Sequence, residues 1–291
     1  MKPSSFVYHR PATIEAALDL LADVGSDGKV LAGGQSLVPL MSMRLAAPAH
    51  LVDINRVDGL GSIRTAAAGV RVGATARHAD VERDAAAFTA VPLLKQAVTH
   101  VAHPTIRNRG TTVGSLTHAD PSGEMTAVLA LLGGTVTLLR RGGERVVEAG
   151  EFFLGPLESA VEPGELAVEA FFPRPPPRSG TAWIEVSRRR GDYAVCGVGT
   201  VVTLDAEWRV EMAKVGLISV GPTPTVVDVT DALVGQPHDA VDADSAGRLI
   251  MAAVDPDPDI HTTAEYRRHL AGALTARAVR DAAGRAVERA A

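Results

Sequence analysis

Two glycine-containing segments hold the residues best suited to binding chemistry. The first is "LAGGQSLVPL" (31–40), in which an apolar run ends at Gly33-Gly34 and Ser36 follows. A strand that passes through glycines into a helix presents free backbone N–H groups to an anion. Glycine suits this position because a Cβ would hold the backbone away from phosphate oxygens. A phosphate contact, a tight packing contact and a plain turn all fit this segment taken alone.

The second segment, "RNRGTTVGSLTHADP" (107–121), combines glycines, hydroxyl side chains and an acid. Its backbone N–H and side-chain O–H groups could donate to a pyrophosphate. The carboxylate of Asp120 could accept from a sugar or ribitol hydroxyl. Because Thr, Ser and Asp are also common as local caps in loops, a structural interpretation stays open as well.

The common nucleotide-binding motifs do not match. Asp53 follows Gly34 by nineteen positions, like the ribose-binding acid of a Rossmann unit. However, Ala32 and Leu37 stand where two glycines of G-x-G-x-x-G belong, and the P-loop pattern is absent. We therefore interpret Asp53 as a strand-end residue and reject a Rossmann or P-loop fold.

Other reactive side chains lack a recognisable arrangement. His100 and His103 do not have the spacing of a zinc site, and Ser115 lacks a nucleophile elbow. Cys196 lies in an apolar run and is interpreted as a small buried side chain. Tyr193, in "GDYAV", offers a flat ring with a polar end, although a core tyrosine fits equally. We predict no metal ligands and no catalytic acid or base.

Composition narrows the class of protein. The chain has 291 residues, a formal charge of −5 and 46% hydrophobic residues, which is typical of a globular protein and gives no sign of a nucleic-acid partner. A single cysteine excludes an internal disulfide and a four-cysteine iron–sulfur cluster, so any redox chemistry here needs an organic cofactor. We expect no membrane span, no signal peptide and a cytoplasmic location.

The first glycine pair should sit in a small unit of strands and helices. Thr13 is a plausible N-cap for a helix over 11–24, which is apolar on one face. Strands are predicted at 29–34 and 50–54, with a helical segment at 35–45 between them. This unit ends near residue 57.

The second segment should be an irregular loop. Residues 103–124 are too polar and too rich in glycine to predict regular structure, and a loop of that length is usually functional or disordered. The best domain boundary is "FFPRPPPRSG" (171–180), because consecutive prolines stiffen a linker and break helices and central strands. Further predicted elements are a strand at 69–74, helices at 79–88, 92–101 and 125–134, a hairpin across Gly142-Gly143, strands at 195–204 and 209–221, and helices at 242–254 and 263–288.

Taken together, four segments resemble one family. They are "AGGQSLVPLMSMRLAAPAHLVDINRV", "IRNRGTTVGSLTHADPSGEM", "RRRGDYAV" and "DIHTTAEYRRHLAGALTARAV". In this order they are similar to the FAD-binding medium subunit of the molybdenum hydroxylases, which include aerobic carbon monoxide dehydrogenase and the xanthine dehydrogenases. The resemblance runs over almost the whole chain and is more specific than any single motif.

The resemblance implies an α+β fold. An FAD-binding domain over 1–175, of the vanillyl-alcohol oxidase (PCMH) kind, would have subdomains over about 1–57 and 58–175. A C-terminal domain over 179–288 would have a three-stranded sheet and a helical bundle. The implied FAD contacts are Ala32, Gly33, Gly34, Gln35, Ser36 and Leu37, then Thr111, Gly114 and Ser115 around the pyrophosphate, Asp120 and Glu124 at cofactor hydroxyls or ring atoms, and Tyr193 beside the isoalloxazine.

The resemblance also implies partners. A large subunit would hold the molybdenum cofactor, a small subunit would hold two [2Fe–2S] clusters, and the complex would be a dimer of heterotrimers. Electrons would reach non-covalent FAD from the clusters and leave to an external acceptor. Two alternatives stay open: a flavin-free scaffold of the same complex, and a free-standing flavin oxidase of the vanillyl-alcohol type.

This sequence departs from the family pattern at three positions. Relatives commonly read Gly-Thr-Ile-Gly-Gly-Asn where this chain has Val113 in a glycine position and Ser115 in the asparagine position. They often carry a lysine where Glu185 stands. The contact of that lysine therefore has no counterpart here.

The first segment yields a direct test. If Gly34 lies against the pyrophosphate, Gly34→Val should abolish FAD retention and leave secondary structure nearly intact. The flavin-to-protein ratio and the far-ultraviolet circular dichroism spectrum measure the two effects. Stoichiometric flavin in the variant would refute the placement.

Overall fold

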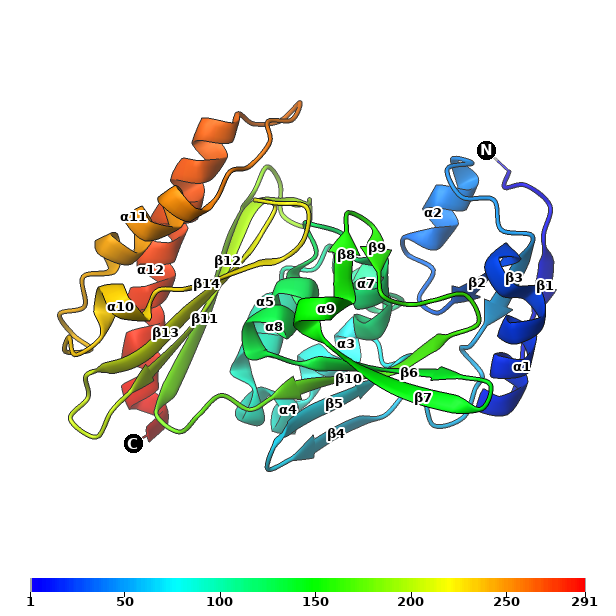
Figure 1. Cartoon of the computed structure of the whole chain (residues 1–291), viewed down its shortest axis with the longest axis horizontal. Helices are drawn as coiled ribbons and strands as arrows, with labels where there is room; N and C mark the ends of the chain where they lie inside the picture. Colours follow the sequence, from blue (N-terminus) through cyan, green and yellow to red (C-terminus); the bar gives the residue numbers. More distant parts are fainter. Residues whose placement is uncertain (1, 291) are drawn as a thin grey trace.

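The computed structural model describes residues 2–290, which form three successive sheets along the long axis of the molecule (Figure 1). The N-terminal sheet is parallel and small, in the order β1-β3-β2. Its strands are β1 (Val7–His9), β2 (Gly28–Leu31) and β3 (His50–Asp53), with helices α1 (Ile14–Val24) and α2 (Leu37–Ser42) and a short 3₁₀ turn at Gly25–Asp27.

The central sheet has five antiparallel strands in the order β4-β5-β10-β6-β7. The strands are β4 (Ile63–Ala66), β5 (Gly69–Gly73), β6 (Thr135–Arg140), β7 (Gly143–Glu148) and β10 (Leu166–Pro173), with a separate pair β8 (Phe153–Gly155) and β9 (Glu158–Ser159). The helices are α3 (His78–Arg83), α4 (Ala85–Ala90), α5 (Pro92–Val98), α6 (Pro104–Arg107), α7 (Thr112–His118), α8 (Glu124–Leu132) and α9 (Ala149–Phe152).

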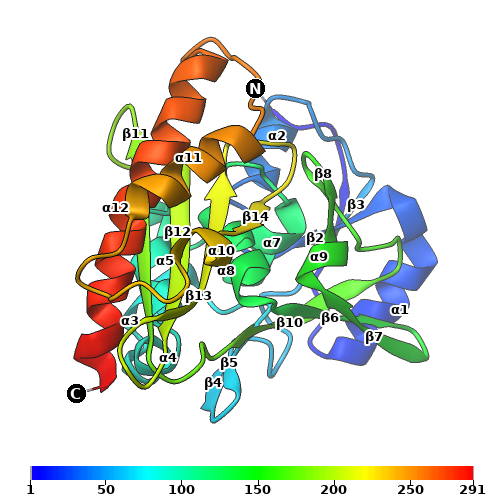
Figure 2. The ribbon, with the colours of Figure 1, turned by 60° about the vertical axis from the view of Figure 1, so that its left-hand side comes forward.

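The C-terminal sheet has four antiparallel strands in the order β11-β12-β13-β14. Figure 2 shows it between the long C-terminal helices on one side and the central helices on the other. The strands are β11 (Ser179–Ser187), β12 (Ala194–Leu204), β13 (Val210–Ile218) and β14 (Thr225–Asp228), and the helices are α10 (Thr230–Leu233), α11 (Ala243–Ala253) and α12 (Ala264–Ala290).

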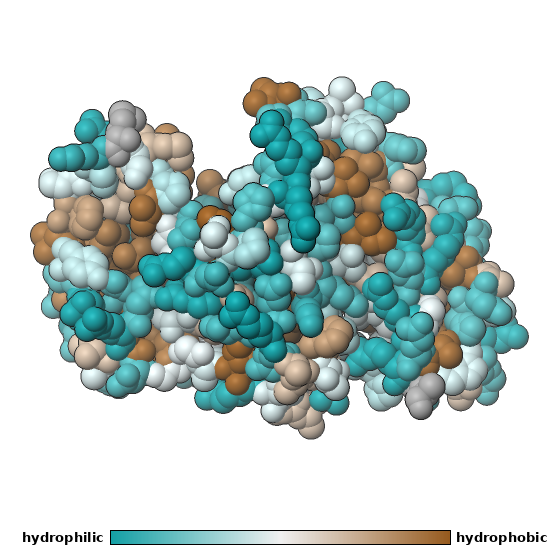
Figure 3. Space-filling view, turned by 180° about the vertical axis from the view of Figure 1, so that it is seen from behind, coloured by the Kyte–Doolittle hydropathy of each residue, from teal (hydrophilic) through white to brown (hydrophobic). Residues whose placement is uncertain are grey.

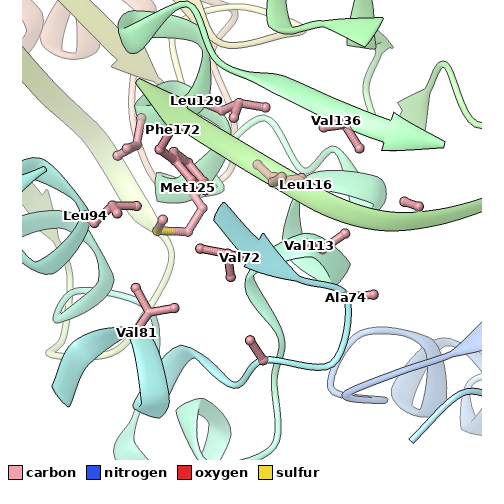
Figure 4. Close-up of a cluster of buried hydrophobic side chains, with 14 of the residues drawn as sticks. Val72, Ala74, Val81, Leu94, Val113, Leu116, Met125, Leu129, Val136 and Phe172 are labelled. Carbon is pink, nitrogen blue, oxygen red and sulfur yellow. The ribbon is translucent and has the colours of Figure 1, made fainter. Parts of the chain in front are cut away.

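The core that supports the site lies between α7, α8 and the central sheet. Val113 and Leu116 of α7 are buried there together with Met125 of α8 and with Val72 and Phe172 of the sheet (Figure 4). Helix α8 is buried on nearly all sides because the C-terminal sheet covers its other face. Both helices are therefore held rigidly by apolar packing.

Two local predictions are confirmed, although the hairpin predicted across Gly142-Gly143 turns one residue earlier. Thr13 caps α1, since its Oγ1 accepts from the backbone N–H of Ala16 at 3.2 Å. The hairpin of β6 and β7 turns at Arg141-Gly142, where Gly142 has φ +77°. Glycine is required there because a side chain makes that backbone conformation unfavourable.

The prediction of an irregular loop at 103–124 is wrong. Residues 104–107 and 112–118 form α6 and α7, and Thr111 caps α7 by accepting from the N–H of Gly114 at 3.1 Å. Helix α7 has two buried apolar residues, Val113 and Leu116, which lie among glycine and hydroxyl residues. Two apolar positions are too few to show the repeat that predicts an amphipathic helix.

The predicted linker and the C-terminal sheet also need correction. Strand β10 continues to Pro173 and β11 begins at Ser179, so only five residues around the three prolines connect the sheets. The C-terminal sheet has four strands rather than three, because the short edge strand β14 pairs with β13.

Gly180 fixes the packing of α12 on β11. A Cβ there would lie 1.9 Å from the carbonyl oxygen of Ala282 and 2.4 Å from the amide nitrogen of Ala286. Gly180→Ala should therefore lower the free energy of unfolding by about 3 kcal/mol, as overpacking of a rigid contact does. Chemical denaturation measures the change.

Gly284→Ala is the matched control. It lies in the same helix, and no atom lies within 4 Å of its Cβ position. Alanine is the better helix former, so this variant should gain up to about 1 kcal/mol. Equal stability of the two variants would contradict the assigned contact.

Candidate functional site

The two glycine segments meet. A Cβ on Gly33 would lie 2.6 Å from the carbonyl oxygen of Arg109 and 2.7 Å from the Cα of Gly110. The segment after β2 therefore touches the segment before α7, backbone against backbone. Gly34 has φ +73°, a conformation that favours glycine. The first glycine is needed for contact between the segments and the second for the shape of the turn.

The backbone of the first segment has free donors. Within the part of the chain that the structure describes, the amide groups of Gly34, Gln35 and Ser36 donate no hydrogen bond. Consecutive amides without partners, at the end of a strand and the start of a helix, suit the oxygens of a pyrophosphate. The residues present thus fit the phosphate part of FAD.

A polar network joins the two segments. Asn55 Nδ2 donates to the carbonyl oxygen of Ala32 at 2.8 Å, and Arg77 Nη2 donates to Asn55 Oδ1 at 2.6 Å. Arg77 Nη1 donates to the carbonyl oxygen of Arg109 at 2.5 Å. These two side chains fix the spacing between the segments, because each bonds across the junction.

The sequence analysis missed Asn55 and Arg77. A signal was available, since both lie just after strands, Asn55 after β3 and Arg77 after β5, as the first glycine pair lies after β2. Polar residues in the same position relative to neighbouring strands are candidates for one shared site. The hydrogen bond between Arg77 and Asn55 joins residues that follow strands of two different sheets, so no periodic pattern in the sequence predicts it.

Helix α7 presents its capped end to the junction. The backbone N–H of His78 donates to the carbonyl oxygen of Gly110 at 2.9 Å, and its ring Nδ1 lies 3.2 Å from Thr112 Oγ1. Burial, helped by the charge of Arg107, lowers the pKa of His78 to about 4, so this imidazole is neutral. The side chain of Val113 is buried in the core with Leu116 and Val72 (Figure 4), and the atoms closest to a Cβ on Gly33 belong to residues 109–111.

The three remaining predicted residues, Asp120, Glu124 and Tyr193, also lie close to one another. Tyr193 is 68% exposed, and its pKa is raised by partial burial and by the carboxylates of Asp120 and Glu124. Asp120 Oδ1 accepts from the N–H of Ser122 at 2.8 Å. Glu124 is buried at the start of α8, where burial and the charge of Glu185 raise its pKa to about 8.

A cavity of about 480 Å³ adjoins Tyr193. Its lining includes Pro121 and Ser122 from the turn before α8, Ser219 just after β13, and Arg267 of α12. Seen from behind, the upper edge of the molecule is deeply indented between the N-terminal part, on the left, and the rest (Figure 3). The chain therefore has a junction with unpartnered backbone amides in one place and a recess beside Tyr193 in another.

Comparisons with known proteins agree over the full length. Residues 4–175 match the model of the FAD binding domain in molybdopterin dehydrogenase, and residues 181–282 match the CO dehydrogenase flavoprotein C-terminal domain. The chain belongs to this family of flavoprotein subunits. The prediction of the family from the four sequence segments is confirmed.

Several relatives span the whole chain. Subunit alpha of the 6-hydroxypseudooxynicotine dehydrogenase complex of Paenarthrobacter nicotinovorans is 39% identical and covers 98% of this chain and 97% of its own. The carbon monoxide dehydrogenase medium chain of Afipia carboxidovorans is 37% identical, over 98% and 99%. Among solved structures, quinoline 2-oxidoreductase from Pseudomonas putida 86 has a TM-score of 0.92 at 34% identity, over 98% and 99%.

These relationships confirm the broader predictions. The flavoprotein subunit has the predicted α+β fold, with an FAD-binding domain followed by a C-terminal domain, and it is an oxidoreductase subunit whose cofactor is FAD. The molybdenum and iron–sulfur centres belong to other subunits of such complexes, and the relatives work with large and small partners. No helix within residues 2–290 is long and apolar enough to cross a membrane.

The polar network can be tested through Arg77. Arg77→Ala removes two hydrogen bonds from a charged donor and frees the two segments to move apart. Bonds of this kind contribute about 1.5–3 kcal/mol each, so FAD affinity should fall at least about tenfold with little change in fold. Flavin fluorescence during titration of the stripped chain measures the dissociation constant.

Arg71→Ala is the control for this variant. Arg71 lies on β5, a few residues earlier, where it pairs with Glu169 and stacks on Phe171 at the surface. Its loss should leave FAD affinity unchanged. If Arg77→Ala binds FAD with unchanged affinity, the hydrogen bonds of Asn55 and Arg77 do not contribute to the site.

Proposed function

We propose that the flavoprotein subunit receives electrons from the iron–sulfur subunit at non-covalently bound FAD and passes them to an external acceptor. The observation that supports this is the junction of the two glycine segments, with free amides after β2 beside the capped end of α7. Such a junction is suited to a pyrophosphate bound between two parts of one chain.

Each predicted site residue has a role in this proposal. Residues 32–37 would bind one side of the pyrophosphate, and Thr111, Gly114 and Ser115 the other. Asp120 and Glu124 would accept hydrogen bonds from cofactor hydroxyls or meet ring atoms. Tyr193, with most of its ring exposed, would lie beside the isoalloxazine.

When bound, FAD supplies the redox chemistry, and the protein binds, orients and shields it. Backbone amides and hydroxyl groups would stabilise phosphate charge by hydrogen bonding, without any titratable group. The partly buried network of Asn55 and Arg77 keeps the amides in position before the cofactor arrives, so little ordering is needed on binding. No side chain of this subunit needs to act as an acid–base catalyst on substrate.

The proposal also covers the organisation of the complex and the division of the chain into domains. It includes a cytoplasmic dimer of heterotrimers, in which a small subunit carries two [2Fe–2S] clusters and a large subunit carries the molybdenum cofactor. It also includes the domain division at 1–175, with parts near 1–57 and 58–175, and at 179–288. The relatives named as subunits or medium chains support a multi-subunit complex.

Spectroscopy tests the proposal. The chain, co-expressed with its partner subunits, should purify with one FAD per chain, release it on denaturation, and lose its visible flavin absorbance when the substrate of the complex is added. A folded but colourless chain would contradict the FAD role and favour a scaffold. Substrate turnover by the isolated chain, without molybdenum or iron, would instead favour a free-standing oxidase.

A further inference from the structure

His103 has no role among the proposed FAD contacts, yet it lies against the turn that carries Tyr193. This turn, residues 188–193, joins β11 to β12. A Cβ on Gly191 would lie 2.5 Å from both Cε1 and Nδ1 of His103 and 3.0 Å from its Nε2. The imidazole ring therefore packs directly on the backbone of the turn, in the space that a side chain at position 191 would need.

The hydrogen bonds inside the turn fix its shape. Arg188 Nη2 donates to Asp192 Oδ2 at 3.1 Å, and the N–H of Asp192 donates to the carbonyl oxygen of Arg189 at 3.0 Å. Asp192 Oδ1 also accepts from the N–H of Tyr193 at 3.1 Å. Because both partners of each bond belong to residues 188–193, these bonds do not attach the turn to the central part of the chain.

Hydrogen bonds attach the turn to the central part on one side of Tyr193. Ser219 Oγ donates to the carbonyl oxygen of Ala194 at 2.8 Å and lies 2.9 Å from Ser122 Oγ. Ser122 belongs to the segment between α7 and α8. Tyr193 therefore lies between this attachment and the contact with His103.

The backbone of His103 is held rigidly. Its carbonyl oxygen accepts from the N–H groups of Ile106 and Arg107, at 2.9 and 3.0 Å, in the first turn of α6. The buried side chain of Arg107 donates to the carbonyl oxygens of Val101 and Ala102, at 3.1 and 3.2 Å. His103 therefore gives the turn a fixed surface to pack against.

The direction of the Tyr193 ring depends on the backbone of the turn. The side chain is 68% exposed, so few neighbours hold the ring itself. Stacking of flat rings requires a defined offset, with ring centres about 4.5–7 Å apart. A turn that shifted against the central part would carry the phenol out of that range.

We propose that His103 is a positioning residue for Tyr193: its imidazole, packed on Gly191, holds the turn so that the phenol ring faces the recess. The inference rests on the proposed function, in which Tyr193 lies beside the isoalloxazine, and it adds the residue that sets the direction of the ring. The contact acts by packing, so a flat apolar ring at position 103 should serve equally well.

The effect on Tyr193 is tested on the full chain without flavin. The chain has three tyrosines, so labelling with 3-fluorotyrosine gives three fluorine NMR signals, and Tyr193→Phe identifies the signal of Tyr193. In His103→Ala this signal should move toward its position in the denatured chain, while the signals of Tyr8 and Tyr266 stay in place. His103→Phe should restore the wild-type position. An unchanged Tyr193 signal in His103→Ala would overturn the proposal.

A second pair of variants separates the contact from backbone strain. Gly191→Ala places a Cβ against the imidazole and should shift the Tyr193 signal, but it should add little in the His103→Ala background, where the ring is gone. Gly235→Ala controls for strain, because Gly235 has φ +77° against +81° at Gly191 and no atom lies within 4 Å of its Cβ position. It should leave the Tyr193 signal unchanged. An equal shift from Gly191→Ala in both backgrounds would show that strain, rather than His103, acts on Tyr193.

The link to the cofactor is tested on the chain loaded with FAD. A tyrosine stacked on flavin quenches its fluorescence, and quenching depends on the stacking geometry, so flavin fluorescence should rise at least about twofold in His103→Ala and return in His103→Phe. Unchanged fluorescence in His103→Ala would overturn the link. If FAD does not shift the fluorine signal of Tyr193 in the wild type, the placement of Tyr193 in the proposed function fails instead. The fluorine signals of the flavin-free variants still decide whether His103 positions Tyr193.

Discussion

The site depends on one contact in which two backbones touch without side chains between them. Gly33 lies against residues 109–111, so the N-terminal part and the central part of the chain meet at van der Waals distance. Any larger residue would separate the free amides after β2 from the capped start of α7. The hydrogen bonds of Asn55 and Arg77 hold the same junction from the side. Close approach and lateral bonding together define the geometry that a bound phosphate would meet.

Sequence patterns predicted the parts of this site better than their arrangement. Local rules identified the Thr13 cap, the turn at Gly142 and the strand just before Gly33, because each depends on a few neighbouring residues. Helix α7 was missed because tertiary burial of Val113 and Leu116, rather than a long apolar period, stabilises it. The whole of β10 was also missed, although it lies at the centre of its sheet, since its apolar residues run directly into the proline segment.

Burial of charge separates two kinds of polar group in this molecule. Arg107 with Glu82 and Arg145 with Glu165 are paired, which offsets their loss of hydration. His78 avoids the same cost by staying neutral beside Thr112. Within the described residues Glu124 has no paired cation. Burial and the neighbouring carboxylates raise its pKa to about 8, so the protonated form is the stable one at neutral pH. The first two arrangements stabilise structure, whereas the third leaves a group whose protonation can change in the working range.

The close contact between Gly180 and α12 has a consequence for synthesis of the protein. Strand β11 needs a helix that the ribosome makes some eighty residues later, and Arg285 of that helix also bonds back to the carbonyl oxygen of Thr181. The N-terminal and central parts can fold while the nascent chain grows, but the outer face of the C-terminal sheet stays bare until α12 emerges. The C-terminal domain can therefore reach its final packing only after α12 has been translated.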